Sequence, residues 1–527
     1  MRRDFSQLHN QRFDLLVCGG GIYGAWTAYD AALRGLKVAL VEQGDWAGGT
    51  SSASSKLIHG GLRYLETYDF KLVNKALAER GMLLAAAPHR VWPLRFGVPL
   101  YAHGRIGSWR MKAGLTLYDL MAGKLGAGMR HRHFSAQEFS RRFPLLRAQA
   151  LRDGYTYADA QTDDARLVLE LVAGAQAAGA VCVNYCKVAD LIETSGRAAG
   201  ARLEDRLDEA RCEIAAQQIV YTNGQWSSTE REARSWSRLA KGVHLLLPGS
   251  QLDEALLLTA PADGRVFFII PWYGRTLLGT TDTDYRGDLD RIAVEDADIA
   301  YLLAAANAFL NTAWRREDVI GSYAGLRVLK QDGDSGANPS SLSRDWELKT
   351  TANGTHYSIG GKLTSAREDA AVIVDTVCAQ LGRSIPCATS ARPFPWAPAE
   401  DFTPWHARTL AQAAALGIDA ESAHWLQRRH GTRTAGVLQL IWGDASLAQR
   451  ILPELPFIYA DLLFCAQGEM VVRLDDLLRR RLPLLILARL DATQLHSLAN
   501  RVAAVLGWDE ARQAREVELC AQRWLTP

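Results

Sequence analysis

The stretch that decides the fold is VCGGGIYGAWTAYDAALRGLKVALVEQ, which runs from Val17 to Gln43. An apolar run ends at Cys18, a glycine-rich turn follows, and an alanine-rich segment then ends near Gly35. A second apolar run, 37–41, closes on Glu42. This order predicts a buried parallel strand, a tight turn, a helix and a second strand. The glycines of the turn form the pattern G-x-G-x-x-G, and they are Gly19, Gly21 and Gly24.

Each part of this unit has a physical role in binding a dinucleotide. Gly19 permits the tight turn, and Gly21 lets the backbone approach a pyrophosphate at the helix N-terminus. Gly24 lets the helix pack closely on the strand. Glu42 is suited to accept hydrogen bonds from a ribose 2′-hydroxyl and would repel a 2′-phosphate, which disfavours NADP. The complete unit is a far stronger signal than three glycines alone, so the sequence predicts a dinucleotide site.

The next stretch, GDWAGGTSSASSKLIHGGLRYLE (44–66), favours FAD over NAD. Its small and hydroxyl side chains are suited to donate hydrogen bonds to phosphate and ribitol oxygens. Gly60 and Gly61 let the chain pass close to a flat ring. A flexible serine-rich linker is the competing interpretation, but apolar residues such as Leu57 and Leu62 argue against it. The hydroxyl donors are Thr50, Ser51, Ser52, Ser54 and Ser55.

Within that stretch, TSSASSKLIHGGLRYLE (50–66) closely resembles the signature of FAD-dependent glycerol-3-phosphate dehydrogenases. Further blocks similar to that family follow in order: RLAKGVHLLLP, PWYGRTLLGTTDTDY, YAGLRVL, SLSRDWEL and GGKLTSARE. The resemblance is close over residues 12–370 and looser beyond. It implies an α/β fold, with a glutathione-reductase-like FAD-binding Rossmann domain interleaved with an antiparallel-sheet substrate domain. The expected bounds are 1–390, with the substrate part mainly at about 235–345, and then 391–527 for a C-terminal α-helical domain.

The resemblance also implies the cofactor, FAD, and the residues that bind it. YSIGGKLTSAREDAAVIVDTV (357–377) predicts a strand, a glycine pair and a helix whose N-terminus faces the pyrimidine end of the flavin. A plain strand-to-helix turn is the alternative for this segment. The expected cofactor-binding residues are Gly19, Gly21, Gly24, Glu42, Gln43, Thr50, Ser51, Ser52, Ser55, Lys56, Leu57, His59, Gly60, Val188, Gly224, Gly361, Lys362, Leu363 and Thr364.

The family's activity is the oxidation of sn-glycerol 3-phosphate to dihydroxyacetone phosphate by hydride transfer to flavin N5. Electrons pass to quinone in the bacterial dehydrogenases and to oxygen in the related oxidases. A phosphorylated polyol requires cations for its dianion. Any single arginine or lysine is more often a solvated surface charge. The prediction therefore depends on several of them occurring together in the blocks that resemble the family. The expected substrate-binding residues are Arg63, Tyr64, Arg344 and Lys362.

Two catalytic roles, removal of the hydroxyl proton and stabilisation of charge, have candidate residues. His244 in KGVHLLLP is the titratable group suited to take the hydroxyl proton, although a lone histidine on an apolar strand is more often structural. His59 is a second candidate for that role. Arg327 stays protonated, so we assign it to binding and charge stabilisation.

Length, net charge, cysteine content and the lengths of apolar runs limit the other possible classes of protein. The chain has 527 residues and a formal net charge of +2, which gives no indication of nucleic-acid binding. Its eight cysteines lack the spacing of a disulfide framework or a zinc site, which predicts a reducing compartment and no metal. No apolar run is long enough to span a bilayer. Residues 105–133 are basic and interleaved with apolar side chains, which fits either a helix lying on an anionic leaflet or a surface helix facing the core.

We therefore expect a cytoplasmic homodimer in peripheral contact with the inner face of the cytoplasmic membrane, with a membrane quinone as electron acceptor. The alternatives are an oxygen-using glycerol-3-phosphate oxidase, an FAD oxidoreductase of another hydroxy acid or amine, and a flavin-binding protein without turnover. In the C-terminal part, EMVVRLDDLLRRRLPLLILARL (469–490) predicts first a packed helix and second a partner or membrane face. The chain departs from the family at Tyr23, Asn223–Gln225, Val328 and Ser365–Ala366.

Overall fold

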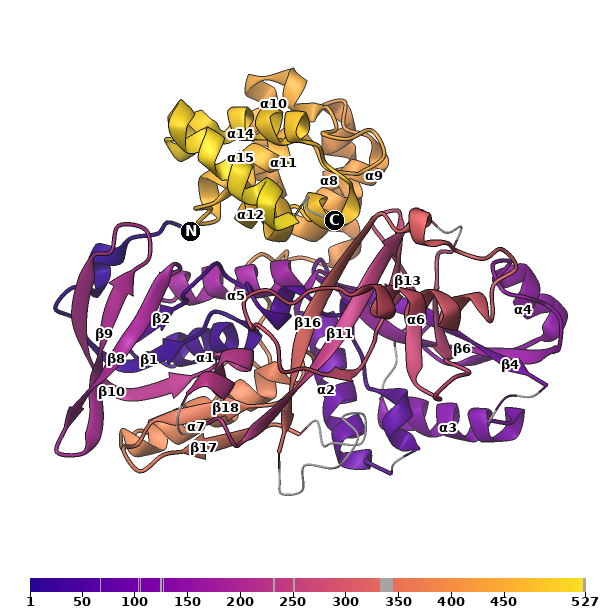
Figure 1. Cartoon of the computed structure of the whole chain (residues 1–527), viewed down its shortest axis with the longest axis horizontal. Coiled ribbons are helices and arrows are strands. Elements are labelled where there is room, and N and C mark those ends of the chain that lie inside the picture. The colour runs from indigo at the N-terminus through magenta and orange to yellow at the C-terminus, as the bar shows by residue number, and fades with distance from the viewer. Residues whose placement is uncertain are drawn as a thin grey trace.

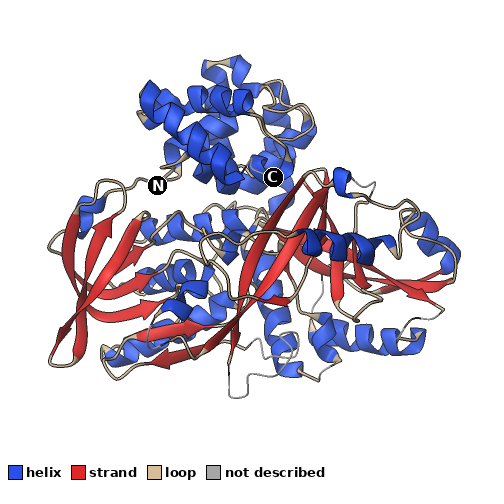
Figure 2. Cartoon of the chain, in the orientation of Figure 1, coloured by secondary structure: helices blue, strands red, loops and turns tan. Residues whose placement is uncertain are grey.

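Two β-sheets stand side by side, and a separate group of helices covers one edge of both (Figure 1). Figure 2 shows this division, with strands confined to the lower part of the view and the upper part entirely helical. The computed structural model describes residues 1–524 except 67, 103, 105, 124–125, 127, 231–232, 250–251 and 332–344.

The first sheet has a parallel centre in the order β7, β2, β1, β10 and β18. Apolar runs with no alternation form the buried centre strands, as expected for strands covered on both faces. A β8–β9 hairpin joins β10, and β17 pairs with β18, both antiparallel. The strands are β1 (Arg12–Cys18), β2 (Val38–Val41), β7 (Val181–Val183), β8 (Cys186–Thr194), β9 (Arg197–Asp205), β10 (Arg211–Tyr221), β17 (Glu347–Thr350) and β18 (His356–Ile359).

Helices α1 (Ile22–Leu33), α5 (Asp164–Ala177) and α7 (Ala366–Gln380) pack together against this sheet. Alanines on α1 keep the helix–helix contacts close, and Trp26 and Tyr29 fill the space beside them. The strand–turn–helix–strand unit predicted from the opening stretch is therefore present, with its turn at the carboxyl end of β1.

The second sheet is mixed and runs β15–β11–β14–β13–β12–β4–β6–β3, with β16 on β11 and β5 on β6. Alternation along β11 sends Val243, Leu245 and Leu247 into a core under α6, while Gly242 and His244 on the other face line the cavity described below. The strands are β3 (Leu57–Ile58), β4 (Val91–Tyr101), β5 (Arg132–Ser135), β6 (Leu151–Thr162), β11 (Ser237–Leu247), β12 (Ala255–Thr259), β13 (Val266–Trp272), β14 (Arg275–Gly279), β15 (Thr283–Asp284) and β16 (Gly321–Lys330). Its helices are α2 (Phe70–Ala86), α3 (Ser108–Met121), α4 (Ala136–Arg142) and α6 (Asp296–Asn307).

The C-terminal part forms the helical group above both sheets (Figure 1). Its helices are α8 (Phe402–Ala415), α9 (Ala420–His430), α10 (Thr434–Gly443), α11 (Tyr459–Gly468), α12 (Leu474–Asp476), α13 (Leu484–Leu487), α14 (Ala492–Leu506) and α15 (Glu510–Trp524). Among the helices described, none has the length and apolarity needed to cross a membrane.

The segment 469–490 is packed, as predicted, but it is not one helix. Its centre is a π-helical turn, Leu477–Arg481, between the short helices α12 and α13. Pro483 follows this turn, and proline has no backbone N–H to continue the ladder. Apolar periodicity therefore predicted that this segment is packed but did not reveal the break in the helix.

Buried ion pairs join the helical group to the first sheet. Arg166 on α5 pairs with Glu469, and both side chains are fully buried. Arg480 and Arg481 pair with Asp45, which follows β2. Removing one partner of such a pair leaves an uncompensated buried charge, so these contacts fix how the helical group sits on the sheet.

Candidate functional site

A cavity of about 570 Å³ lies between the two sheets. From the first sheet, the ends of β1, β2, β10 and β18 and their following turns line it. From the second sheet, β11, β13 and β16 supply side chains to the same space. The cavity thus opens at the carboxyl ends of parallel strands, where α/β folds bind their ligands.

The first-sheet side of the cavity has the features that a dinucleotide requires. Gly19 (φ 111°) makes the turn after β1, and a Cβ on Gly24 would stand 1.8 Å from the Gly19 carbonyl oxygen. The Glu42 carboxylate accepts from the N–H groups of Gly20 at 2.6 Å and Gly44 at 2.8 Å. Burial raises the pKa of Glu42. Asn223 lines the cavity, and its buried Oδ1 has no hydrogen-bond partner among the described residues.

The hydroxyl-rich segment is ordered and connects the two sheets. Ser51 Oγ accepts from the Ile22 N–H at 2.9 Å, at the N-terminus of α1. Thr50 Oγ1 donates to the Leu326 carbonyl on β16 at 2.6 Å. The segment therefore runs along the cavity wall where the sheets meet.

Most residues assigned to the cofactor from the sequence line this cavity. Four do not: Gly24, Ser52, Lys56 and Gly60. Gly24 supports the helix–strand packing described above, and Gly60 packs against Leu77 and Tyr118. Lys56 turns away from the cavity to Asp164, with 2.6 Å between Nζ and Oδ1, because a buried ammonium requires a carboxylate partner. Val188 on β8 does line the cavity, although β8 belongs to the antiparallel hairpin.

Three of the predicted cations meet at the cavity, and the fourth, Arg344, lies outside the described residues. Lys362 Nζ lies 3.9 Å and the Arg63 guanidinium 5.2 Å from the centre of the Tyr64 ring. Such cation–π contacts hold both charges beside one ring. Arg327 on β16 donates to the Asp282 carboxylate at 3.0 Å and to the Thr280 hydroxyl at 3.0 Å.

His244 lines the same cavity from the neighbouring strand, β11. Its Nε2 lies 2.8 Å from Ser55 Oγ, and its ring stacks on Tyr323 with centroids 4.9 Å apart. Its Nδ1 is buried and has no hydrogen-bond partner among the described residues. Burial lowers the pKa of His244 well below its usual value, and Arg327 and Lys56 lower it further. The imidazole is therefore neutral at pH 7 and available to accept a proton.

Two glycines that the sequence analysis did not single out make room for these groups. A Cβ on Gly242 would meet the Arg327 guanidinium at 2.7 Å, and one on Gly279 would meet the His244 ring at 2.3 Å. Tyr323, directly across the ladder from His244, was likewise not singled out. All three stand in or beside the family blocks, but only the strand register shows which residues face each other.

Tyr23, a departure from the family pattern, lies at the turn after β18. Its hydroxyl donates to Asp369 at 2.7 Å and accepts from the Lys362 N–H at 3.0 Å. Ser365, another departure, donates to the same carboxylate at 3.2 Å. Tyr23 therefore links α1 to α7 and to the glycine turn that precedes it, and Ser365 bonds to the same Asp369 carboxylate.

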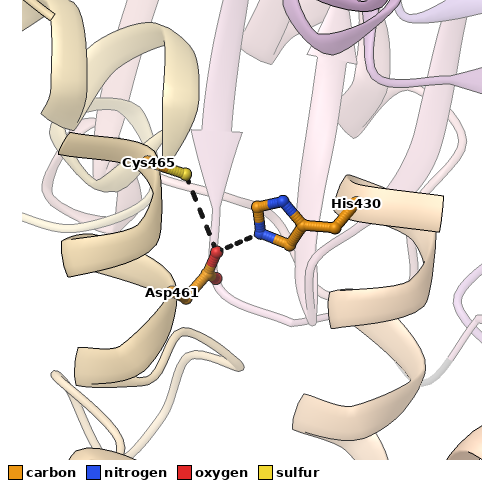
Figure 3. A group of neighbouring side chains, drawn as sticks. All are labelled: His430, Asp461 and Cys465. Carbon is orange, nitrogen blue, oxygen red and sulfur yellow. Dashed lines mark hydrogen bonds and ion pairs between the residues drawn. The ribbon is translucent and has the colours of Figure 1, made fainter. Parts of the chain in front are cut away.

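One group of described residues has ligand types that suit a metal: His430, Asp461 and Cys465 (Figure 3). Asp461 accepts from His430 Nε2 at 2.5 Å and also pairs with Arg429. The Arg166 guanidinium lies 3.4 Å from His430 Nδ1 and 4.0 Å from Cys465 Sγ. Because a metal ion here would face two guanidinium groups, we interpret the cluster as part of the buried ion network that joins α5 to the helical group.

Comparison with known proteins agrees with this geometry. The model of the family described as FAD dependent oxidoreductase matches residues 14–367, and that of the C-terminal domain of alpha-glycerophosphate oxidase matches residues 387–513. The chain is therefore an FAD-dependent oxidoreductase, and its cofactor is FAD. The glycine turns, Glu42 and the hydroxyl segment provide a site that fits this cofactor.

Relatives that match over nearly the whole length of both chains show which family of FAD-dependent oxidoreductases this is. A glycerol-3-phosphate dehydrogenase from Synechocystis sp. is 35% identical, covering 98% of this chain and 97% of the relative. An aerobic glycerol-3-phosphate dehydrogenase from Bacillus subtilis is 34% identical, covering 91% and 90%. The structure of the glycerol-3-phosphate dehydrogenase from Bacillus halodurans, complexed with FAD, has a TM-score of 0.80 at 30% identity and covers 98% and 96%. The chain belongs to the family of FAD-dependent glycerol-3-phosphate dehydrogenases.

The packing of α1 on β1 makes a direct prediction for cofactor retention. We expect Gly24→Ala to purify with little FAD, because its Cβ would force α1 and the turn at Gly19 apart. The ratio of the flavin band at visible wavelengths to the protein absorbance measures this. Gly81→Ala on α2, where a Cβ meets nothing within 4 Å, is the control and should retain FAD. Full FAD content in Gly24→Ala would contradict this assignment.

Proposed function

We propose that the chain oxidises sn-glycerol 3-phosphate to dihydroxyacetone phosphate in this cavity. The observation that carries the proposal is the meeting of Arg63, Lys362 and Arg327 with a neutral, buried His244 around one space. A phosphate dianion requires several cations, and an alcohol to be oxidised requires a group that removes its proton. Each requirement has a candidate within the same cavity.

In this proposal Arg63 and Lys362 bind the phosphate, and Tyr64 keeps both cations at fixed positions. Arg327, held by Asp282 and Thr280, stabilises negative charge that develops on the carbon 2 oxygen. His244 accepts the hydroxyl proton at Nε2, the nitrogen that the cavity-lining Ser55 hydroxyl already reaches. Bound FAD would supply the acceptor for the hydride that leaves carbon 2. Because the resting imidazole is neutral, it is ready to accept the proton.

We further propose that the electron acceptor is a membrane quinone and that α3 makes the membrane contact. Trp109, Leu117 and Leu120 on this helix are exposed, and Trp109 keeps 76% of its surface in water. Tyr68 and Phe70, before and at the start of α2, are also exposed. Exposed Lys71, Arg110 and Lys112 add positive charge. α2 and α3 contact one another, so these side chains suit an anionic bilayer surface.

The substrate proposal predicts selective bleaching of the flavin. Under anaerobic conditions, glycerol 3-phosphate should reduce the bound FAD, whereas glycerol, lactate and proline should not. We expect Lys362→Met to raise the apparent substrate dissociation constant about tenfold to a hundredfold, the effect of losing one charge-assisted hydrogen bond. Lys37→Met is the control, because Lys37 is exposed, directly precedes β2 and does not line the cavity. A flavin that glycerol 3-phosphate leaves oxidised contradicts the proposal.

The lowered pKa of His244 predicts a pH dependence. We expect the limiting rate of flavin reduction not to fall around pH 6.5, where an ordinary histidine titrates, because burial keeps the pKa of His244 well below that value. In Arg327→Gln the pH at which the rate falls should be higher, because a cation that lowers the pKa is removed. Coincident profiles would contradict the assignment of His244.

The membrane proposal is tested by sedimentation with vesicles. We expect the protein to bind vesicles that contain anionic lipid, and the double change Trp109→Ser, Leu120→Ser to weaken this binding without affecting anaerobic flavin reduction. Trp442→Ser, a change of a 73% exposed tryptophan on α10, is the matched control. Equal binding of all three proteins would place the membrane contact elsewhere. The electron acceptor is tested separately by turnover: a rate with oxygen equal to that with a quinone would support an oxidase instead.

A further inference from the structure

The π-helical turn Leu477–Arg481 brings three consecutive arginines of the C-terminal helical group into the interior. Arg480 Nε lies 2.5 Å from Asp45 Oδ2, and an Arg481 nitrogen lies 2.8 Å from Asp45 Oδ1. Both therefore end at a carboxylate three residues after Glu42, beside the cofactor side of the cavity. Arg479 takes a different course, toward the second sheet.

Among the residues that the structure describes, Arg479 has no carboxylate partner of this kind. Its guanidinium lies between aromatic neighbours, 5.4 Å from the centre of the Tyr323 ring and 5.1 Å from that of Trp524. One of its terminal nitrogens, Nη1, is buried without a hydrogen-bond partner among the described residues. Burial lowers the pKa of Arg479 to about 10, so it stays charged at pH 7. The negative charge of Asp164 offsets part of the cost of burying this cation, and the guanidinium itself lies against the two rings.

Tyr323 connects this arginine to the proton acceptor. Its ring is stacked on His244, with an angle of 18° between the two planes. Its hydroxyl donates to the Ser54 carbonyl at 2.7 Å, and the next residue, Ser55, hydrogen-bonds to His244 Nε2. The contacts thus form a closed ring, from Tyr323 through Ser54 and Ser55 to His244 and back. A shift of Tyr323 would disturb both the stacking and the hydrogen bond that orient the imidazole.

We propose that Arg479 is a positioning residue, through which the C-terminal helical group holds Tyr323 against His244. The inference rests on the proposed function, because His244 is the proton acceptor only in that reaction. Trp524, at the end of α15, supports Arg479 and so extends this contact chain to the last described residue. The helical group would then help to position the proton acceptor, in addition to packing on the two sheets.

The experiment compares Arg479→Met, which keeps the length of the side chain but not its charge, with Arg479→Lys, which restores a cation over the ring. Stopped-flow reduction of the FAD-loaded enzyme by glycerol 3-phosphate separates the limiting rate from the substrate dissociation constant. For Arg479→Met we expect the limiting rate to fall about tenfold, as for a small misplacement of a reacting group. The dissociation constant and the FAD content should stay within about twofold, and Arg479→Lys should recover most of the rate.

Arg523→Gln is the matched control. Arg523 also lies 5.2 Å from the Trp524 ring but is exposed, so this change should leave the limiting rate unaltered. A wild-type rate in Arg479→Met overturns the inference. So does a parallel loss of rate, substrate affinity and FAD, since that pattern indicates a purely structural role.

A second measurement keeps the inference testable without any substrate. In a crystal structure of FAD-loaded Arg479→Met, we expect the Tyr323 and His244 rings to have moved out of their stacked arrangement. Unmoved rings overturn the inference regardless of which substrate the enzyme uses. Failure of the wild-type protein to be reduced by glycerol 3-phosphate would instead count against the proposed function, so the two failures are distinguishable.

Discussion

The buried ion pair between Lys56 and Asp164 supports both halves of the site. Lys56 Nζ lies 2.6 Å from Asp164 Oδ1 and also donates to the Ser52 carbonyl at 2.9 Å. The other carboxylate oxygen of Asp164 accepts from the N–H and the hydroxyl of Ser54. One carboxylate at the start of α5 therefore fixes the hydroxyl segment against the cavity wall. Either charge buried there without the other would destabilise the folded protein, so the two residues are required together.

Two consequences of this pair reach the chemistry of the site. The segment it fixes carries Ser55, whose hydroxyl orients His244, and Ser54, whose carbonyl receives Tyr323. The Lys56 ammonium also helps to lower the pKa of His244, so the same ion pair acts on the position and the protonation of the imidazole. Replacing Lys56 by a neutral residue would strand Asp164 as well, which makes the effects on folding and on the site inseparable.

The parts of this structure that depend on local sequence were predictable. The first strand, glycine turn and helix follow from residues adjacent in the chain, and the structure contains them as β1 and α1. Family blocks placed Arg63, Lys362, Arg327 and His244 at one cavity although they are far apart in sequence. Lys56 was assigned to the cofactor because of its block, yet its side chain turns to Asp164. A stretch that resembles the family shows which segment lies near the site. The direction of each side chain in that segment depends on how the folded chain packs.

The contact between Arg479 and Tyr323 had no local signal. It depends on a π-helical turn that apolar periodicity does not reveal and on the strand register that sets Tyr323 opposite His244. The apolar spacing of 469–490 predicted a packed helix, or else a partner or membrane face, but did not predict that its three arginines join the helical group to the two sheets. Long-range packing of this kind is set by tertiary structure, so it appears only when the whole chain is folded.

The central claim is that one cavity holds the phosphate among the cations and the carbon 2 hydroxyl at His244. A crystal structure of the reduced, FAD-loaded enzyme with glycerol 3-phosphate tests it most directly. We expect phosphate oxygens in contact with Arg63 and Lys362, and the carbon 2 hydroxyl within hydrogen-bond distance of His244 Nε2 or of the Ser55 hydroxyl bound to it. A phosphate bound away from these cations, or a hydroxyl out of reach of both groups, would contradict it.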